Sequence, residues 1–448
     1  MMRCCRSPLV TCLLGLTLLC AIPAQAAADS RLIVRAKPVL FLSSLTIVKN
    51  ACRLLGCSVL YGLDGTIGNL FLVSVPDILD VRIVSSLLSL INGIVAVEAD
   101  AAVHTEGRRG EGTGGSPPPA LLDEDPVSYY ATSVRGGYVR QPAYEILGLA
   151  EAQSRYNATG KNVTVAVIDT GVDPDHPALR QVLLPGYDFT RNKAGGSERD
   201  DVDQSTMTVL DDGKPGWVNQ STMAVLDQST MAVLDGPEYG AFGHGTIVAG
   251  IVHLAAPRAK ILPMKAFRAD GSGVVSDVLR AIYKSTQEGA KVINMSFSFE
   301  TNSKELEKSI EYATGRGVVA VSSAGNDGKK IDVYPASLST VMGVASTTDW
   351  DTLSTFSNYG PSVAWIAAPG EAIVSTYPLG TYAAAWGTSF SAPFASGTAA
   401  VLAEIANIGN KQAADAEGAS VWISYEVTKG RLDVPSAILA WRNSVGLP

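Results

Sequence analysis

Short apolar runs alternate with helical patterns over the last two thirds of the chain. Four β-branched runs predict buried strands, at Val163–Ile168, Ile261–Lys265, Val292–Met295 and Val318–Ser322. Apolar residues at helical spacing predict helices between them, at Ile247–Ala256, Val275–Glu288 and Lys304–Thr314. This alternation is typical of an α/β fold with a doubly wound, mostly parallel sheet covered by helices on both faces. In such sheets a site forms at the carboxyl ends of the strands.

The first 26 residues have the pattern of a secretory signal peptide. A basic start is followed by an apolar run from about Leu9 to Ile22 and by the small residues of Ala24-Gln25-Ala26. A membrane anchor is the less favoured alternative, because the run is shorter than the roughly 20 residues that span a bilayer. We therefore expect a secreted protein, periplasmic or extracellular, without membrane contact after signal removal.

The next part of the chain predicts a small α+β domain followed by a linker. Strand-like and helix-like pieces alternate, at Arg31–Ala36, Ser44–Leu55, Asn69–Val75, Val81–Leu90 and Gly93–Asp100. The glycine-, charge- and proline-rich run Gly107–Pro119 is typical of a flexible linker. We expect a signal peptide at 1–26, a small domain at 27–103, a linker at 104–141 and a large domain at 142–448.

An octapeptide of the form QSTMxVLD occurs three times, at Gln204–Asp211, Gln220–Asp227 and Gln228–Asp235. Its period is too short for a solenoid unit. The alternation of residue types within each copy predicts short strands on an inserted arm, which we place at residues 191–240. A structural insertion is favoured over an exosite that touches substrate or a partner.

Composition narrows the class of protein. Hydrophobic residues make up 46% and charged residues 17%, the balance of a globular enzyme. The net charge of -8 argues against nucleic acid or an anionic membrane as the main partner, because both need clustered Lys and Arg. All six cysteines lie before Ser58, so the large domain contains no disulfide and depends on its core.

Two motifs carry residues that can act as a base and its orienting group. Asp169 follows the strand Val163–Ile168, where a carboxylate can orient a neighbouring imidazole. An isolated aspartate there is more often a turn or cap residue. His244 lies between Gly243 and Gly245 at a helix start, which lets backbone and substrate approach closely. A single histidine is usually structural. The catalytic interpretation of His244 therefore depends on the other motifs, as does that of Asp169.

Two further motifs can supply a nucleophile and an oxyanion donor. Ser389 begins a helix of small apolar residues, whose first backbone N–H groups can receive an oxyanion. Alone, it could equally be an N-cap. Asn326 lies in the glycine-rich stretch Ser322–Gly328 after a strand, where its amide can donate to an oxyanion or simply form a turn.

Together the four motifs closely resemble the subtilisin-like serine peptidase family. They occur in that family's order, as Asp169-Thr170-Gly171, Gly243-His244-Gly245-Thr246, the Asn326 loop and Gly387-Thr388-Ser389-Phe390-Ser391-Ala392-Pro393. The resemblance covers about residues 142–438. It implies a serine endopeptidase in which Ser389 attacks, His244 carries the proton, Asp169 fixes the imidazole and Asn326 binds the oxyanion.

The resemblance also implies how substrate binds and how the precursor matures. Ser296, Phe297 and Ser298 would pair with the substrate backbone, and Ser323, Ala324 and Gly325 would form part of the S1 wall. Residues 27–103 resemble an inhibitory prodomain, whose last stretch, Val95–Asp100, would lie product-like in the cleft. The linker would hold the maturation site. The expected partners are protein or peptide substrates and the chain's own prodomain, as an intramolecular inhibitor.

Departures from the family pattern bear on metal binding. Ile247 stands where many members carry a second histidine, which leaves the triad intact. Val252–Pro257 runs straight on to Ile261, so the loop that often builds a calcium site is missing. We therefore expect no cofactor and no metal ligands, and calcium at that place is doubtful.

Two other functions compete with this interpretation. A secreted pseudoprotease that only binds peptides, with weak or no catalysis, would keep the same fold. An α/β-hydrolase esterase is disfavoured, because Gly387–Ser391 lacks the second glycine of the nucleophile elbow and the order of the triad differs.

Overall fold

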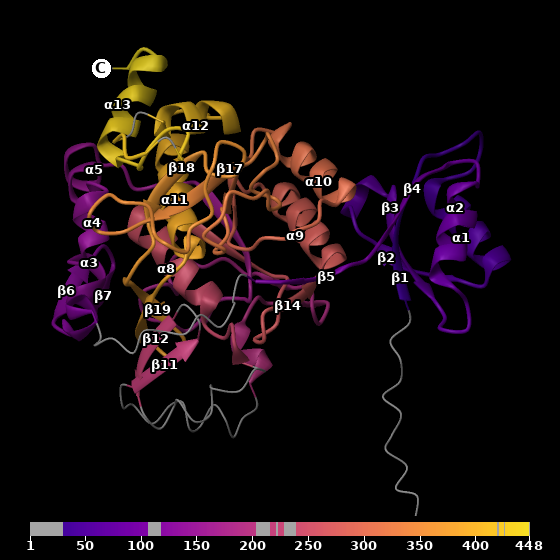
Figure 1. Ribbon diagram of the computed structural model, residues 1–448, viewed down its shortest axis with the longest axis horizontal. Helices are drawn as coiled ribbons and strands as arrows, with labels where there is room; N and C mark the ends of the chain where they lie inside the picture. The colour runs from indigo at the N-terminus through magenta and orange to yellow at the C-terminus, as the bar shows by residue number, and fades with distance from the viewer. Residues whose placement is uncertain are drawn as a thin grey trace, which may run out of the picture.

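The small and the large domain lie side by side in the computed structural model (Figure 1). The structure describes residues 30–105, 118–202, 216–220, 223–227, 239–418, 421–424 and 426–447. The predicted signal peptide and most of the glycine- and proline-rich run lie outside these residues. No helix in the described ranges is both long and apolar enough to cross a membrane.

The N-terminal domain is a four-stranded antiparallel sheet with two helices. Its strand order is β2-β3-β1-β4. The strands are β1 Ser30–Ala36, β2 Ser58–Gly62, β3 Leu70–Val75 and β4 Ile94–Ala99, and the helices are α1 Ser44–Leu55 and α2 Val81–Ser89. Ser43 caps the first helix, which ends where Gly56 takes a left-handed conformation, and a disulfide joins Cys52 of this helix to Cys57, the residue before β2. The predicted α+β pieces thus form, with bounds shifted by about a residue.

The large domain is built on an eight-stranded sheet. Its order is β10-β9-β13-β8-β15-β16-β17-β18, and all neighbours except β9 and β10 pair in parallel. The strands are β8 Thr164–Asp169, β9 Tyr187–Asp188, β10 Lys193–Ala194, β13 Lys260–Lys265, β15 Val292–Met295, β16 Val319–Ser323, β17 Met342–Thr347 and β18 Ile366–Pro369. The predicted doubly wound α/β fold is therefore confirmed.

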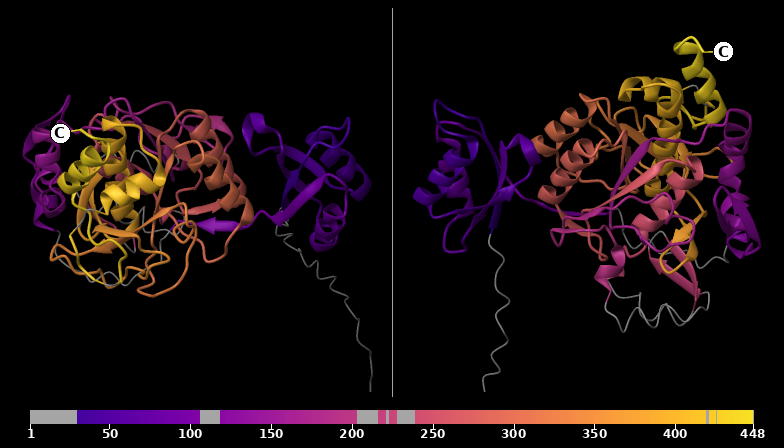
Figure 2. Two further views of the ribbon diagram at one scale, coloured as in Figure 1. Left: turned by 90° about the horizontal axis from the view of Figure 1, so that it is seen from above. Right: turned by 180° about the vertical axis from the view of Figure 1, so that it is seen from behind.

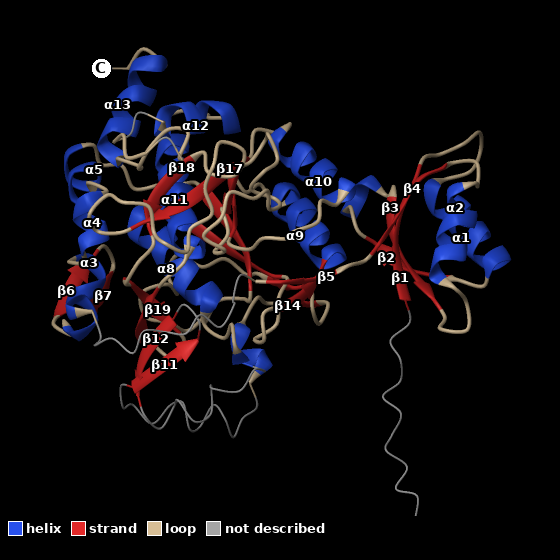
Figure 3. Ribbon diagram, in the orientation of Figure 1, coloured by secondary structure: helices blue, strands red, loops and turns tan. Residues whose placement is uncertain are grey.

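Helices cover both faces of this sheet, as the views in Figures 2 and 3 show. On β8, Val165 and Val167 join the core formed with α8 (His244–Ala255) and α11 (Thr388–Ile405), whereas Ala166 and Ile168 join the opposite core. That second core is completed by α9 (Val275–Gln287) and α10 (Lys304–Thr314). Because side chains alternate along a strand, a continuous apolar run supplies both cores. The polar residue of β8 that is central to the site, Asp169, is accordingly its last one.

Smaller elements complete the domain. Around the main sheet lie β5 Ala102–His104, β6 Pro126–Tyr129, β7 Thr132–Arg135, β11 Gly216–Gln220, β12 Met223–Asp227, β14 Ser272–Val274, β19 Ile373–Tyr377, β20 Thr381–Ala385, α3 Gly136–Val139, α4 Pro142–Ile146, α5 Leu149–Arg155, α12 Asn410–Glu417 and α13 Val434–Ser444. The second octapeptide copy contributes β12, which pairs with β20. The other two copies lie outside the described residues.

The predicted linker is shorter than residues 104–141. Residues 118–141 form the β6/β7 hairpin and α3, which pack on the large domain. Tyr129 and Tyr138 are buried, and their hydroxyls donate to the carbonyls of Leu254 at 2.9 Å and Gly250 at 2.6 Å, both in α8. The prediction extended the linker too far beyond the glycine- and proline-rich run, which ends at Pro119. The tyrosines that attach residues 118–141 to α8 follow that run within about 20 residues.

Candidate active site

Asp169 and His244 meet at the carboxyl end of β8. Asp169, the last residue of that strand, is buried, and its Oδ1 accepts from His244 Nδ1 at 2.7 Å. Two glycines allow this approach. Gly243 has a φ of 85°, and a side chain there would meet the Tyr377 ring at 2.1 Å. A side chain at Gly245 would meet the Gly171 carbonyl oxygen at 2.0 Å.

Ser389 lies in the first turn of α11, directly before Phe390. The ring of Phe390 is 5.3 Å from the His244 ring, centroid to centroid. Ser389 Oγ donates to the Ser296 carbonyl at 3.3 Å, and Ser296 Oγ donates to the Ser389 carbonyl at 2.8 Å. His244 Nε2 is buried and has no hydrogen-bond partner among the described residues. The structure thus joins Asp169 and His244 directly, and it packs Phe390, the neighbour of Ser389, against the His244 ring.

Asn326 is held against the N-terminus of α11. Its Oδ1 accepts from the Thr388 backbone N–H at 2.9 Å and from the Thr388 hydroxyl at 3.0 Å. This fixes the orientation of the amide, because a backbone N–H can only donate. The Nδ2 side then faces Gly387, where a side chain would lie 3.4 Å from Nδ2. The amide nitrogen of Asn326 therefore lies next to Gly387, two residues before Ser389.

A cavity of about 740 Å³ opens beside Asn326. One wall is the tail segment, Glu98–Thr105, and the other comes from Ser298–Ser303, Asp327 and Val333. In the tail segment, β5 pairs antiparallel with β14, and the Thr105 N–H donates to the Gly271 carbonyl at 2.8 Å. Of the predicted stretch Val95–Asp100, only Glu98 and Ala99 line this cavity, because β4 stays paired with β1, and the strand added to β14 comes later, at Ala102–His104.

The residues predicted to bind substrate divide into two groups. Ser298 lines the cavity, whereas Ser296 and Phe297 are buried below it, Phe297 being stacked on Phe299. The three residues predicted to form the wall are buried just before Asn326 in the chain: Ser323, Ala324 and Gly325. None of these three is among the residues that line the cavity. They support the Asn326 loop, and β14 forms an edge that the sequence interpretation missed.

Sequence reasoning also missed a buried polar network behind the Asp169–His244 pair. Glu198 and Lys265 are completely buried, each with several hydrogen bonds. Burial raises the pKa of Glu198 to about 8, and Lys265 opposes that shift. Glu198 lies in a polar stretch of the sequence, which gives no local signal of burial. The position of Lys265 at the end of an apolar strand was the one available hint.

Comparison with known proteins places these residues in a family. The model of the subtilase family matches residues 160–421. Thermitase from Thermoactinomyces vulgaris is 33% identical over 294 residues, which cover 63% of this chain and 90% of thermitase. Subtilisin BL from Lederbergia lenta is 31% identical over 258 residues, covering 56% of this chain and 80% of that protein.

The fold has a solved counterpart as well. Fervidolysin from Fervidobacterium pennivorans, described as a keratinolytic enzyme related to subtilisin, superimposes with a TM-score of 0.67 at 22% identity. The match covers 92% of this chain and 61% of fervidolysin, so it supports the fold. Taken with the sequence relatives, these findings show that the chain belongs to the subtilase family and is a serine-type endopeptidase.

Proposed function

We propose that this enzyme cleaves peptide bonds with Asp169, His244 and Ser389 as its catalytic triad and is secreted as a self-processing precursor. The observation that carries the proposal is the 2.7 Å bond from His244 Nδ1 to Asp169, which leaves the buried Nε2 without a hydrogen-bond partner among the described residues, while Phe390, next to Ser389, packs on the His244 ring. A carboxylate on Nδ1 fixes the tautomer whose Nε2 can accept a proton.

The chemistry follows from these positions. Ser389 Oγ attacks the peptide carbonyl carbon while its proton passes to His244 Nε2. The carbonyl oxygen becomes an oxyanion that accepts from Asn326 Nδ2 and the Ser389 N–H. His244 then gives the proton to the leaving amine as the C–N bond breaks, and water repeats the sequence on the acyl-enzyme. Ser389 Oγ must first turn from the Ser296 carbonyl, to which it now donates.

A peptide-binding pseudoprotease is the alternative, and hydrolysis of casein separates the two. The proposed enzyme hydrolyses casein and is blocked by a serine-directed fluorophosphonate. Ser389→Ala should abolish turnover. Ser391→Ala is the matched control, since Ser391 is a buried serine of the same helix whose hydroxyl donates to the Pro369 carbonyl. Equal activity of wild type and Ser389→Ala would refute the proposed nucleophile.

We further propose that the N-terminal domain is an inhibitory prodomain. Its acidic side chains cap two helices of the enzyme. Asp100 accepts from the Ser276 N–H at the start of α9, at 2.8 Å, and Glu98 accepts from the hydroxyl of Ser303, the N-cap of α10, at 2.6 Å. Arg35 of β1 adds an ion pair to Glu305.

Inhibition would come from the tail segment. β5 occupies the edge of β14 as an added strand, the mode by which extended peptides bind sheet edges. Val103 belongs to the same buried apolar cluster as Phe267 and Phe297, so a side-chain site is filled too. A substrate that needs this edge is excluded while the tail segment lies there.

A further inference from the structure

The carboxyl group of Glu198, outside the proposed triad, contacts the residue after Asp169 and the residue before His244. We propose that Glu198 is a positioning residue, which holds Asp169 and His244 in the register that proton transfer requires. This inference rests on the proposed function, because it assigns a role around the proposed base.

The contacts of Glu198 bridge the two motifs. Its Oε2 accepts from the Gly243 backbone N–H at 2.9 Å and from the Thr170 hydroxyl at 3.2 Å, and its Oε1 accepts from the Thr246 hydroxyl. Thr170 directly follows Asp169, and Gly243 directly precedes His244. One side chain therefore ties the end of β8 to the start of α8.

The two threonine hydroxyls depend on this carboxyl. Thr170 Oγ1 accepts from the Gly245 N–H at 3.0 Å, and Thr246 Oγ1 accepts from the Asp173 N–H at 2.8 Å. Each hydroxyl thus has its proton left to donate, and both donate to Glu198. Without the carboxyl, two hydroxyl protons and the Gly243 N–H would lose their acceptor in a buried place, at a cost for each.

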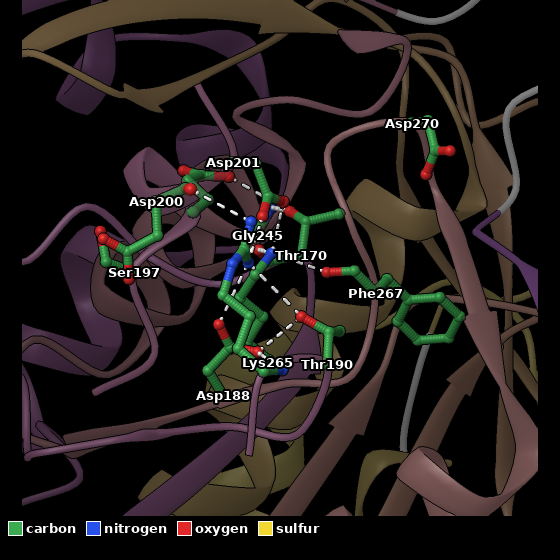
Figure 4. A network of polar contacts seen from close by, with 12 residues as sticks. Thr170, Asp188, Thr190, Ser197, Asp200, Asp201, Gly245, Lys265, Phe267 and Asp270 are labelled. Atoms are coloured by element: carbon green, nitrogen blue, oxygen red, sulfur yellow. Dashed lines mark hydrogen bonds and ion pairs between the residues drawn. The ribbon is translucent and has the colours of Figure 1, made fainter. Parts of the chain in front are cut away.

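A buried cation holds the same turn from its other side. Lys265 Nζ donates to the Thr170 carbonyl at 2.6 Å and to the Phe267 carbonyl at 2.7 Å, and it pairs with Asp201 at 2.7 Å (Figure 4). Asp201 ends the short helix Glu198–Asp201 that carries Glu198. Thr170 is therefore clamped between Glu198 and Lys265, which leaves the Asp169 carboxylate little freedom to move.

The charged surroundings give the role a readout in pH. Asp169, Asp173, Lys265 and Tyr377 face Glu198 from neighbouring elements. Burial raises the pKa of Glu198 to about 8, with Asp173 and Asp169 adding to the shift and Lys265 opposing it. Glu198 therefore changes charge within the working range of an assay, next to the proposed base.

The test compares Glu198→Ala, Glu198→Gln and the control Asp200→Asn, which alters a carboxyl of the same short helix that pairs with Lys193. Active sites are counted with the fluorophosphonate. We expect Glu198→Ala to lose about 10- to 100-fold in kcat per active site with KM nearly unchanged, as misplacement of the pair predicts. Glu198→Gln, which keeps the shape and one acceptor, should recover most of kcat but lose any inflection of kcat near pH 8.

A purely structural role would lower melting temperature and the active fraction, but leave kcat per active site at the wild-type value. That result overturns the inference. If Glu198→Ala does not fold, Glu198→Gln decides: a kcat profile identical to wild type near pH 8 overturns the role. An active Ser389→Ala enzyme would instead refute the proposed nucleophile, so the two failures are distinguishable.

Discussion

At the scale of single residues, Asn326 has its side-chain oxygen held by Thr388 and its amide nitrogen turned toward the end of α11. We expect Asn326→Ala to lose about 10²–10³ in kcat with little change in KM, because one oxyanion donor is lost only in the transition state. Asn302→Ala is the control, since Asn302 lines the cavity without contacting Thr388 in the described structure. Unchanged kcat in Asn326→Ala would exclude the oxyanion role.

His253 makes the stability of the fold sensitive to acid. Both ring nitrogens are buried without hydrogen-bond partners among the described residues, and burial lowers the pKa of His253 from 6.5 to about 4. The unfolded chain therefore binds a proton between about pH 6.5 and 4 that the folded chain does not, so stability falls as pH drops through that window. The full loss is about 3 kcal/mol.

Urea denaturation at pH 7 and pH 4.5 tests this, in the Ser389→Ala background to prevent self-digestion. His253→Phe keeps a ring against Tyr129, whose centroid lies 5.6 Å away. The variant should lose less stability than its parent between the two pH values. Equal losses would mean that other groups cause the acid sensitivity.

At the scale of elements, the segment 118–141 is fastened to α8, the helix that begins with His244. Tyr138→Phe removes the 2.6 Å bond to the Gly250 carbonyl and should lower the free energy of unfolding by about 1 kcal/mol. Tyr130→Phe is the control, because Tyr130 is exposed. Denaturant unfolding of both variants measures the difference, and equal values would mean that the buried hydroxyl contributes nothing.

Elements with a strong local pattern were predictable from the sequence, and those made by distant contacts were not. β15 and α10 have the predicted bounds, because apolar spacing alone defines them. The three-residue strand β5 exists only because β14 lies beside it. Glu198 was equally invisible, since its neighbours in the sequence are polar and its burial comes from the end of β8 and the start of α8.

At the scale of the whole molecule, the proposed maturation cut is expected between two segments that are bound to the large domain. Thr105 is tied to Gly271, and packing resumes by residue 118, so we expect the cut within residues 106–117. N-terminal sequencing of the secreted wild-type protein should therefore find a first residue between about 107 and 118. Ser389→Ala, expressed away from other proteases, should keep the prodomain attached. Cutting of both proteins at the same bond and rate would require an outside protease.

The whole molecule should also tolerate chelation. Within the described ranges, no group of three or more His, Cys, Asp or Glu side chains is arranged to hold a metal ion. Because the loop that often builds a calcium site is missing between Val252 and Ile261, and a ligand stabilises only through a site in the native state, we expect EDTA to leave the melting temperature of Ser389→Ala nearly unchanged. A large fall, reversed by added calcium, would reveal a site that the calcium expectation missed.

The Cys52–Cys57 disulfide lies in the N-terminal domain, which the proposed maturation would remove. The other four cysteines lie within the first 20 residues, so none lies in residues 118–448, the part that a cut within 106–117 would release. Thiol reductants then have a disulfide to reduce in the N-terminal domain and none in residues 118–448. Once free, the protease should work equally in oxidising and reducing surroundings, whereas its precursor alone responds to them.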